Sequence, residues 1–225
     1  MAIKYPTKDG KVVLEGERDH ASIRGASSGF ASSNDSSHAL AVGYVYDMAR
    51  RSYSIYRSFF CFDTSDITST ISSATFGVRG STNSSADTII VKSDAFGGDC
   101  GTTLANGDYN NLDFTTPYSS ERTSLNTNSA YNDFTLNSDA INDIKNNNSF
   151  TLALIEHDYD YSNVDGRGYQ VKNGLYYVDN SGVSSDPKLT YTLAGYDKDI
   201  IGVASADIVS VIGVATADID NVIGV

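Results

Sequence analysis

The sequence has little positive charge and few charged residues of either sign. Its 225 residues include 16 Lys and Arg against 28 Asp and Glu, for a net charge of −12, and charged residues make up only 20% of the chain. Binding to phosphates requires a basic surface, so this balance argues against a nucleic-acid partner. Ser, Asn, Thr, Gly and Tyr take the place of charged residues, a composition more typical of extracellular or virion β proteins than of cytosolic enzymes.

Long hydrophobic runs are also missing. No apolar stretch approaches the ~18 residues of a membrane-spanning helix, so we expect no membrane partner. Residues 1–20 are charged and contain no hydrophobic segment, which predicts synthesis in the cytoplasm without a secretory signal. A chain of this length can form one large β domain, or one domain with a small appendage.

Cysteine is scarce, with only Cys61 and Cys100. The two could pair in an oxidising compartment, but two cysteines without a signal peptide are more often free, buried thiols. Because Cys61 lies in the apolar run SFFCFD (58–63), we expect free thiols, with a disulfide as the alternative. No adjacent His marks either residue as a catalytic thiol.

Histidine is equally scarce. His20, His38 and His157 lie among Ser-rich or acidic neighbours, without a nucleophile elbow or a metal-binding His pair. We interpret His157 and its neighbour Glu156 as the end of a strand, where both can be ordinary surface residues. No spacing singles out a catalytic carboxylate pair among the 28 acidic residues, so we expect that the protein is not an enzyme.

The residues that are abundant favour β-strands. With 15 Tyr, 19 Gly and only three Pro, the chain shows short β-branched or aromatic runs separated by polar turns. This pattern predicts an all-β fold, a jelly-roll-like antiparallel β-sandwich. The predicted strands are KVVLEG (11–16), HASIRG (20–25), HALAVGYVY (38–46), YSIYRSFFCFD (53–63), SATFGVRG (73–80), DTIIVKSD (87–94), SFTLALIEHD (149–158), GYQVKN (168–173) and KLTYTLAG (188–195).

One short helix is expected in LNSDAINDIKNNN (136–148). Ser138 can cap its N-terminus, and Ala140, Ile141 and Ile144 form one apolar stripe. The composition then changes abruptly at about Asp199, where a repeat begins. We therefore expect a sandwich domain over residues 1–198 and a repeat segment over residues 199–225.

Several short motifs follow one another along the chain: Asp19 with Ile23, Gly29-Phe30, LAVG (40–43), RSFFCFDTSDI (57–67), ISSATF (71–76), the helix at 140–144, the strand 150–155, the loop EHDYDYSNVDG (156–166) and PKLTYT (187–192). Their order resembles the DNRLRE-type, or disaggregatase-related, carbohydrate-binding module. The resemblance covers roughly residues 10–195 and implies a β-sandwich found on bacterial surface proteins, polysaccharide-degrading enzymes and some phage proteins. We expect structural roles for its central motif: Arg57 pairs with an acidic residue across the sheet, and Asp63 accepts hydrogen bonds in a turn.

The loop HDYDYSNVDGRG (157–168) is the densest polar cluster. Asp158, Asp160 and Asp165, with the hydroxyl of Ser162, offer alternating oxygen ligands of the kind that Ca²⁺ prefers. Their spacing departs from that of an EF-hand loop. Two interpretations stay open, a Ca²⁺ site and a solvated acidic loop.

Tyrosines gather late in the chain. Aromatic faces beside Asp and Asn side chains commonly hold sugar rings, but Tyr is also frequent on sandwich surfaces and in subunit contacts. Both interpretations stay open for this set, which is the candidate glycan site: Tyr159, Tyr161, Tyr169, Tyr176 and Tyr177.

The segment IIGVASADIVSVIGVATADIDNVIGV (200–225) repeats every eleven residues. An eleven-residue period fits a helical supercoil, whereas its Gly and β-branched residues favour short strands joined by turns. Two units and a fragment are too few for an independent solenoid, so their apolar side chains need partners. We expect oligomerisation or anchoring, with an extension of the chain's own sandwich as the alternative, through Ile201, Val203, Ile208, Val211, Ile212, Val214, Ile219 and Val222.

Repeats of this type look like the tails of phage structural proteins. The sequence therefore predicts a non-enzymatic virion protein, such as a capsid decoration, head-fibre or tail-associated protein. Its partners would be sister subunits in a homo-oligomer such as a trimer, other virion proteins and, as a secondary property, host polysaccharide. The alternative is a free-standing carbohydrate-binding module or surface adhesin. No cofactor other than Ca²⁺ is expected.

Overall fold

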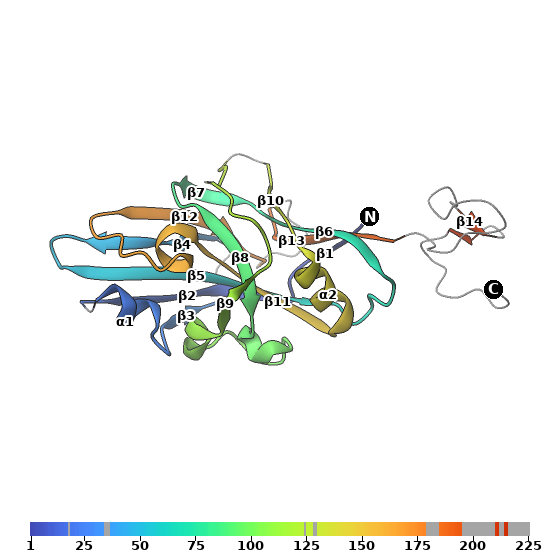
Figure 1. Ribbon diagram of the computed structural model, residues 1–225, viewed down its shortest axis with the longest axis horizontal. Coiled ribbons are helices and arrows are strands. Elements are labelled where there is room, and N and C mark those ends of the chain that lie inside the picture. Colours follow the sequence, from blue (N-terminus) through green and yellow to red (C-terminus); the bar gives the residue numbers. More distant parts are fainter. Residues whose placement is uncertain are drawn as a thin grey trace.

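The computed structural model describes residues 1–17, 19–33, 37–123, 125–127, 130–178 and 185–194, and the strand residues 210–211 and 214–215. Two antiparallel sheets of four and nine strands form a β-sandwich, with a few short helices (Figure 1). The predicted all-β sandwich is confirmed. Among the described residues, none of the helices has the length and apolar character needed to cross a membrane.

The smaller sheet brings the two ends of the sandwich sequence together. Its order is β1 (Ala2–Lys4), β13 (Lys188–Leu193), β6 (Ile71–Val78) and β10 (Asn132–Thr135). Phe76 of β6 is paired with Leu189 on one side and with Phe134 on the other. All three side chains are buried, so this register aligns one apolar row across the sheet.

The larger sheet is organised around β5, which is paired along both edges. One edge of β5 pairs with β2 over residues 53–61. The other edge pairs with two strands in turn, with β4 over residues 52–56 and with β11 over residues 58–63. The sheet therefore divides at β5: β12 and β7 continue from β4, whereas β8 and β9 continue from β11 (Figure 1). The strands are β2 (Lys8–Gly16), β3 (Phe30–Ser32), β4 (Ser37–Asp47), β5 (Ser52–Asp63), β7 (Gly80–Ser84), β8 (Thr88–Ser93), β9 (Leu112–Pro117), β11 (Ser149–Glu156) and β12 (Gln170–Tyr176).

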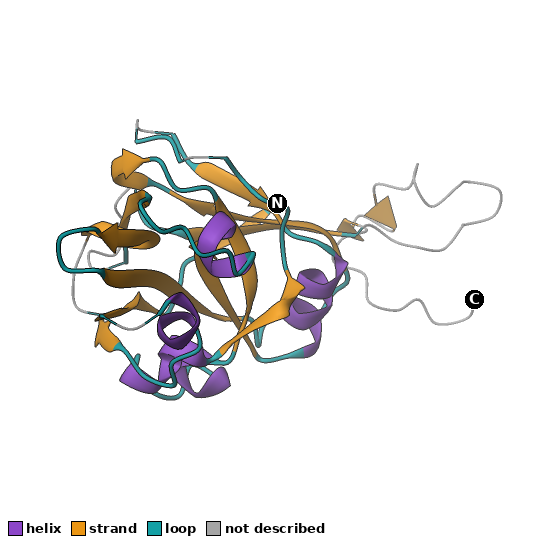
Figure 2. Cartoon of the chain, turned by 60° about the vertical axis from the view of Figure 1, so that its left-hand side comes forward, coloured by secondary structure: helices purple, strands orange, loops and turns teal. Residues whose placement is uncertain are grey.

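Both faces of β5 are buried, in two different cores. Phe60 and Phe62 point into the core between the sheets, whereas Ile55, Phe59 and Cys61 point into a second core on the outer face. This alternation follows from the two-residue period of a strand. Short helices cover the second core, and Figure 2 shows them outside the strands: α1 (His20–Arg24), η1 (Ala95–Gly98), η2 (Asn106–Asn110) and the single π turn η3 (His157–Tyr161).

Helix α1 replaces a predicted strand. The side chain of Asp19 accepts a hydrogen bond from the Ser22 amide (3.0 Å) and caps the helix, and His20 and Ile23 are its buried residues. Buried side chains three residues apart lie on the same face of a helix, and the Asp19 cap stabilises the helix relative to an extended strand. The prediction of a strand at 20–25 is therefore wrong, and Phe30–Ser32, which the predicted strands leave out, forms β3.

The one helix expected from the sequence is present as α2 (Ser138–Asn146), with a different cap. The side chain of Asn137 rather than Ser138 accepts a hydrogen bond from the Ala140 amide (3.1 Å), so the helix begins one residue earlier than its predicted cap implies. Ala140 and Ile144 pack in the core between the sheets, as the apolar stripe predicts.

Cys61 and Cys100 form a disulfide that joins β5 to the loop after η1, with their Cα atoms 5.8 Å apart. The expectation of free thiols is therefore wrong. Cys61 is buried as expected, but the second core places it beneath the η1 loop, 39 residues away in sequence. The spacing of the two cysteines in the sequence did not indicate that contact.

Most of the predicted oligomerisation residues lie outside the described residues, namely Ile201, Val203, Ile208, Ile212, Ile219 and Val222. Val211 and Val214 are paired in a small antiparallel sheet of β14 (Ser210–Val211) and β15 (Val214–Ala215). These four residues are strands rather than helical turns.

Candidate functional site

The chain leaves β11 through the η3 turn, whose backbone is fixed by Glu156. The Glu156 carboxylate is buried and accepts hydrogen bonds from the amides of Asp158 (2.8 Å), Tyr159 (2.7 Å) and Asp160 (3.0 Å). Burial raises the pKa of Glu156 to about 7, and the three amide donors oppose that rise. Glu156 is therefore a buried cap of the turn, and its interpretation as a surface residue is wrong.

A buried ion pair ties η3 to the centre of the large sheet. Arg57 donates from Nε to Asp160 Oδ2 (2.8 Å) and from Nη2 to Asp160 Oδ1 (2.7 Å). Its remaining donors reach the carbonyls of Tyr109 (2.6 Å) and Arg24 (2.9 Å). Burial lowers the pKa of Arg57, but the Asp160 carboxylate outweighs this effect and raises it. The predicted pairing of Arg57 with an acidic residue is confirmed, although the partner lies in a turn rather than on a facing strand.

A second arginine completes this cluster. The Arg24 guanidinium lies 3.8 Å from the centre of the Phe114 ring and donates from Nε to the backbone carbonyl of Asp160. Burial lowers the pKa of Arg24, and the charge of Asp160 opposes that change. Asp160 thus accepts hydrogen bonds from two arginines in the protein interior, so its role is structural.

The three carboxylates predicted to bind Ca²⁺ do not come together. Asp158 is exposed, Asp160 is buried against Arg57, and Asp165 accepts a hydrogen bond from the hydroxyl of Tyr53 (3.1 Å). Ser162, the fourth proposed ligand, is exposed just after the turn. In the single helical turn of η3, side chains two positions apart point in different directions. In an extended loop they would point to the same side.

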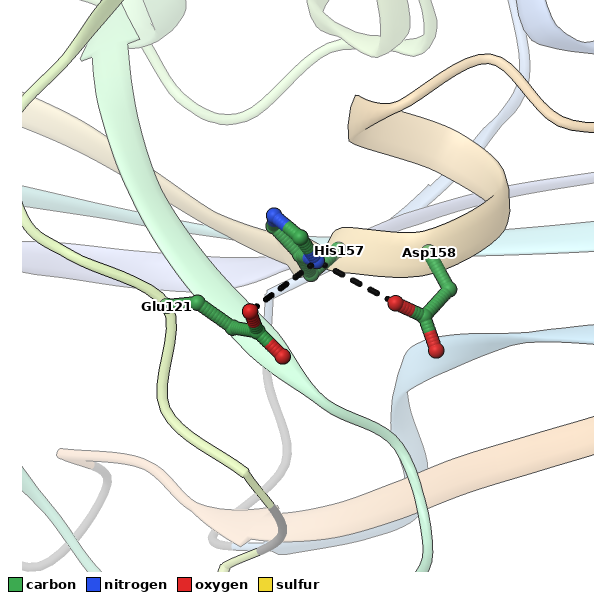
Figure 3. Close-up of side chains that lie close together, drawn as sticks. All are labelled: Glu121, His157 and Asp158. Atoms are coloured by element: carbon green, nitrogen blue, oxygen red, sulfur yellow. Dashed lines mark hydrogen bonds and ion pairs between the residues drawn. The ribbon is translucent and has the colours of Figure 1, made fainter.

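Asp158 instead meets His157 and Glu121. Figure 3 shows the three side chains converging, with His157 Nδ1 lying 3.2 Å from Asp158 Oδ1 and 3.6 Å from Glu121 Oε2. Their ligand atoms all lie within 4.8 Å of one another, a separation compatible with a shared metal ion. The imidazole ring also stacks on Tyr161, with ring centres 5.6 Å apart. Sequence reasoning missed Glu121, which is 36 residues from His157 and belongs to no motif.

The five candidate glycan tyrosines are divided among different environments. Tyr159 and Tyr169 stack with ring centres 5.5 Å apart, and Tyr169 is 59% exposed. Tyr161 stacks on His157, and Tyr176 is partly buried in β12. Tyr177 is buried, with its hydroxyl 2.5 Å from Ser58 Oγ. Only the Tyr159–Tyr169 pair therefore offers an exposed aromatic face.

A polar cleft of about 360 Å³ lies at the other end of β11. At its centre, Asp143 accepts hydrogen bonds from Lys92 Nζ (2.8 Å) and from the Tyr118 hydroxyl. Burial raises the pKa of Asp143, but these hydrogen bonds outweigh that effect and hold it below its ordinary value. No sequence motif marked this cleft, which is lined by Lys92, Ser93, Asp94, Gly98, Asp99, Tyr118, Asp143, Asn147, Asn148, Ser149, Phe150 and Thr151.

Comparison with known proteins adds no further assignment: no protein-family model matches the sequence, and no curated protein matches it. The resemblance to DNRLRE-type modules therefore remains a prediction.

Proposed function

We propose that the protein is a non-enzymatic structural protein of a phage virion, in which the sandwich is displayed and the C-terminal repeat binds sister subunits. The repeat is the observation that carries this proposal. Its described part is a two-stranded sheet with two residues in each strand, which is too small to be stable alone. Two repeat units cannot bury their own apolar side chains, so they require partners.

The chemistry of the sandwich supports a role without catalysis. Strongly perturbed ionisable groups often mark active sites. Here the buried Glu156 carboxylate is occupied by three backbone amides, and the buried Arg57 by Asp160 and two carbonyls. These groups hold the fold together and are not open to a substrate.

The proposed setting agrees with the surface chemistry. The chain is acidic, with a net charge of −12, and is rich in Ser, Asn and Thr. A disulfide and a buried ion cluster cross-link the second core, which suits a protein that must persist outside a cell. The solution mass of the full chain tests assembly, and peptide mass spectrometry of purified virions tests the location. A monomer, or absence from the particle, would contradict the proposal.

A second candidate function is carbohydrate binding, which the polar cleft around Asp143 favours. Its wall combines Lys, Asp and Asn side chains in a volume suited to a small polar ligand. A glycan array of the full chain, with and without Ca²⁺, tests this candidate. Loss of binding in Asn148→Trp, which fills the cleft, would place the sugar there. Loss in Tyr169→Ala alone would place it on the Tyr159–Tyr169 pair, and an array without any signal would remove this candidate.

A further inference from the structure

Glu121, His157 and Asp158 bring three potential metal ligands close together, within 4.8 Å of one another. With metal–ligand bonds of about 2.1 Å, two ligand atoms lie about 3.0 to 3.4 Å apart for octahedral to tetrahedral angles. His157 Nδ1 is 3.2 Å from Asp158 Oδ1 and 3.6 Å from Glu121 Oε2. The Glu121 and Asp158 side chains are exposed and face His157, so both carboxylates have room to close on one ion (Figure 3).

Backbone pairing holds these residues in place. Thr88 of β8 is paired with Glu156 in the sheet and with Arg122 through an isolated bridge of two hydrogen bonds (2.9 and 2.8 Å). Glu121 and His157 directly adjoin these two partners of Thr88. The His157 amide donates to the carbonyl of Asp87 (2.8 Å), and the Glu156 carboxylate fixes the Asp158 amide. The site is therefore preorganised by the sheet and the η3 turn.

The charges of the cluster favour a cation. In the described part of the chain, the ion pairs recorded for Glu121 and Asp158 are those with His157, and neither carboxylate has a Lys or Arg partner. Two carboxylates without a fixed positive partner, on a protein with a net charge of −12, create a negative potential. A divalent cation bound between them would neutralise it.

We propose that Glu121, His157 and Asp158 bind a divalent transition-metal ion of the Zn²⁺ class. An imidazole nitrogen is a preferred ligand of Zn²⁺, Ni²⁺ and Co²⁺, whereas Ca²⁺ takes oxygen ligands almost alone. The site thus differs in both residues and metal from the Ca²⁺ loop expected at Asp158, Asp160 and Asp165. The ion would tie the loop at Glu121 to η3, the turn that also carries the buried Asp160.

Isothermal titration of the EDTA-treated and dialysed full chain with ZnCl₂, and separately with CaCl₂, tests the proposal. We expect one Zn²⁺ per chain and no measurable Ca²⁺ binding at the same concentrations. His157→Ala and Glu121→Gln should each weaken Zn²⁺ binding at least tenfold, because the first removes the imidazole ligand and the second replaces a charged carboxylate by a neutral, weaker amide ligand. Glu15→Gln, which removes the same charge at an exposed site elsewhere, should leave it unchanged.

Three further measurements separate the possible outcomes. Circular dichroism should show that each variant folds, and Co²⁺ should give a visible absorption band with the parent chain that His157→Ala lacks. At a Zn²⁺ concentration 100 times its dissociation constant, the melting temperature should rise by about 5 to 10 °C. No Zn²⁺ binding up to millimolar concentration would overturn the proposal. So would equal binding by His157→Ala, or equal weakening by Glu15→Gln and Glu121→Gln.

Discussion

The Arg57 guanidinium and the Asp160 carboxylate face each other in a bidentate ion pair, with two hydrogen bonds of 2.8 and 2.7 Å and no exposure of either side chain. The residues are 103 positions apart, so the pair joins the central strand to the turn that ends β11. That turn also carries the half-buried His157 and the exposed Asp158. The buried pair therefore helps to position two of the three candidate metal ligands.

Asp160→Asn should strongly destabilise the protein. It leaves the buried Arg57 charge without a counter-charge, which typically costs about 3–5 kcal/mol of unfolding free energy. Urea denaturation of the full chain measures the change. As a matched control, Asp66→Asn removes the ion pair between the exposed Asp66 and the partly buried Lys4, which should cost about 1 kcal/mol or less. Equal effects of the two substitutions would show that the buried pair does not hold η3 in place.

The disulfide should contribute strongly to stability. A covalent link across 39 residues is worth about 4 kcal/mol in the chain-entropy model. We expect Cys61→Ala combined with Cys100→Ser to lower the melting temperature, and a reducing agent to have the same effect on the parent chain but none on the variant. Peptide mapping without reduction should recover the linked peptides. Two reactive thiols in the denatured, unreduced protein would contradict this account.

The Lys92–Asp143–Tyr118 cluster predicts a loss of stability in acid. Burial raises the pKa of Asp143, but the hydrogen bonds from Lys92 and Tyr118 keep it below the ordinary value of 3.8. The unfolded state therefore binds the proton more readily, and the contribution of Asp143 is complete above pH ~4 and is lost as the pH falls further. The stability difference between the parent chain and Asp143→Asn should be constant from pH 5 to 7 and shrink below pH 4. A difference that does not change with pH would exclude this role.

Local patterns in the sequence predicted the sandwich and much of β5. The alternation of Phe60 and Phe62 with Phe59 and Cys61 is a two-residue period, which a strand imposes directly. The pattern could not show that both faces are buried in separate cores. It also read 20–25 as a strand, because the capping side chain of Asp19 was not weighed against the alternation.

The partners within the candidate site could not be identified from the sequence, because they lie far apart along the chain. The sequence predicted an acidic partner for Arg57, but only the fold identifies it as Asp160. Asp158 and Asp160 looked equivalent as alternating ligands, yet the Glu156-capped turn exposes one and buries the other. Glu121 reaches His157 only because Thr88 pairs with both neighbouring segments.

The solution mass of the full chain, measured by light scattering during size-exclusion chromatography, tests the central claim most directly. The account predicts a multiple of the 24.1 kDa chain mass. Val203→Asp combined with Val214→Asp, at two apolar positions of the repeat, should give a monomer, because buried charges would oppose the contact. Ser205→Asp combined with Thr216→Asp adds the same charge at polar positions and should leave the oligomer intact. A monomeric parent chain, or an oligomer that the valine substitutions do not change, would contradict assembly through the repeat.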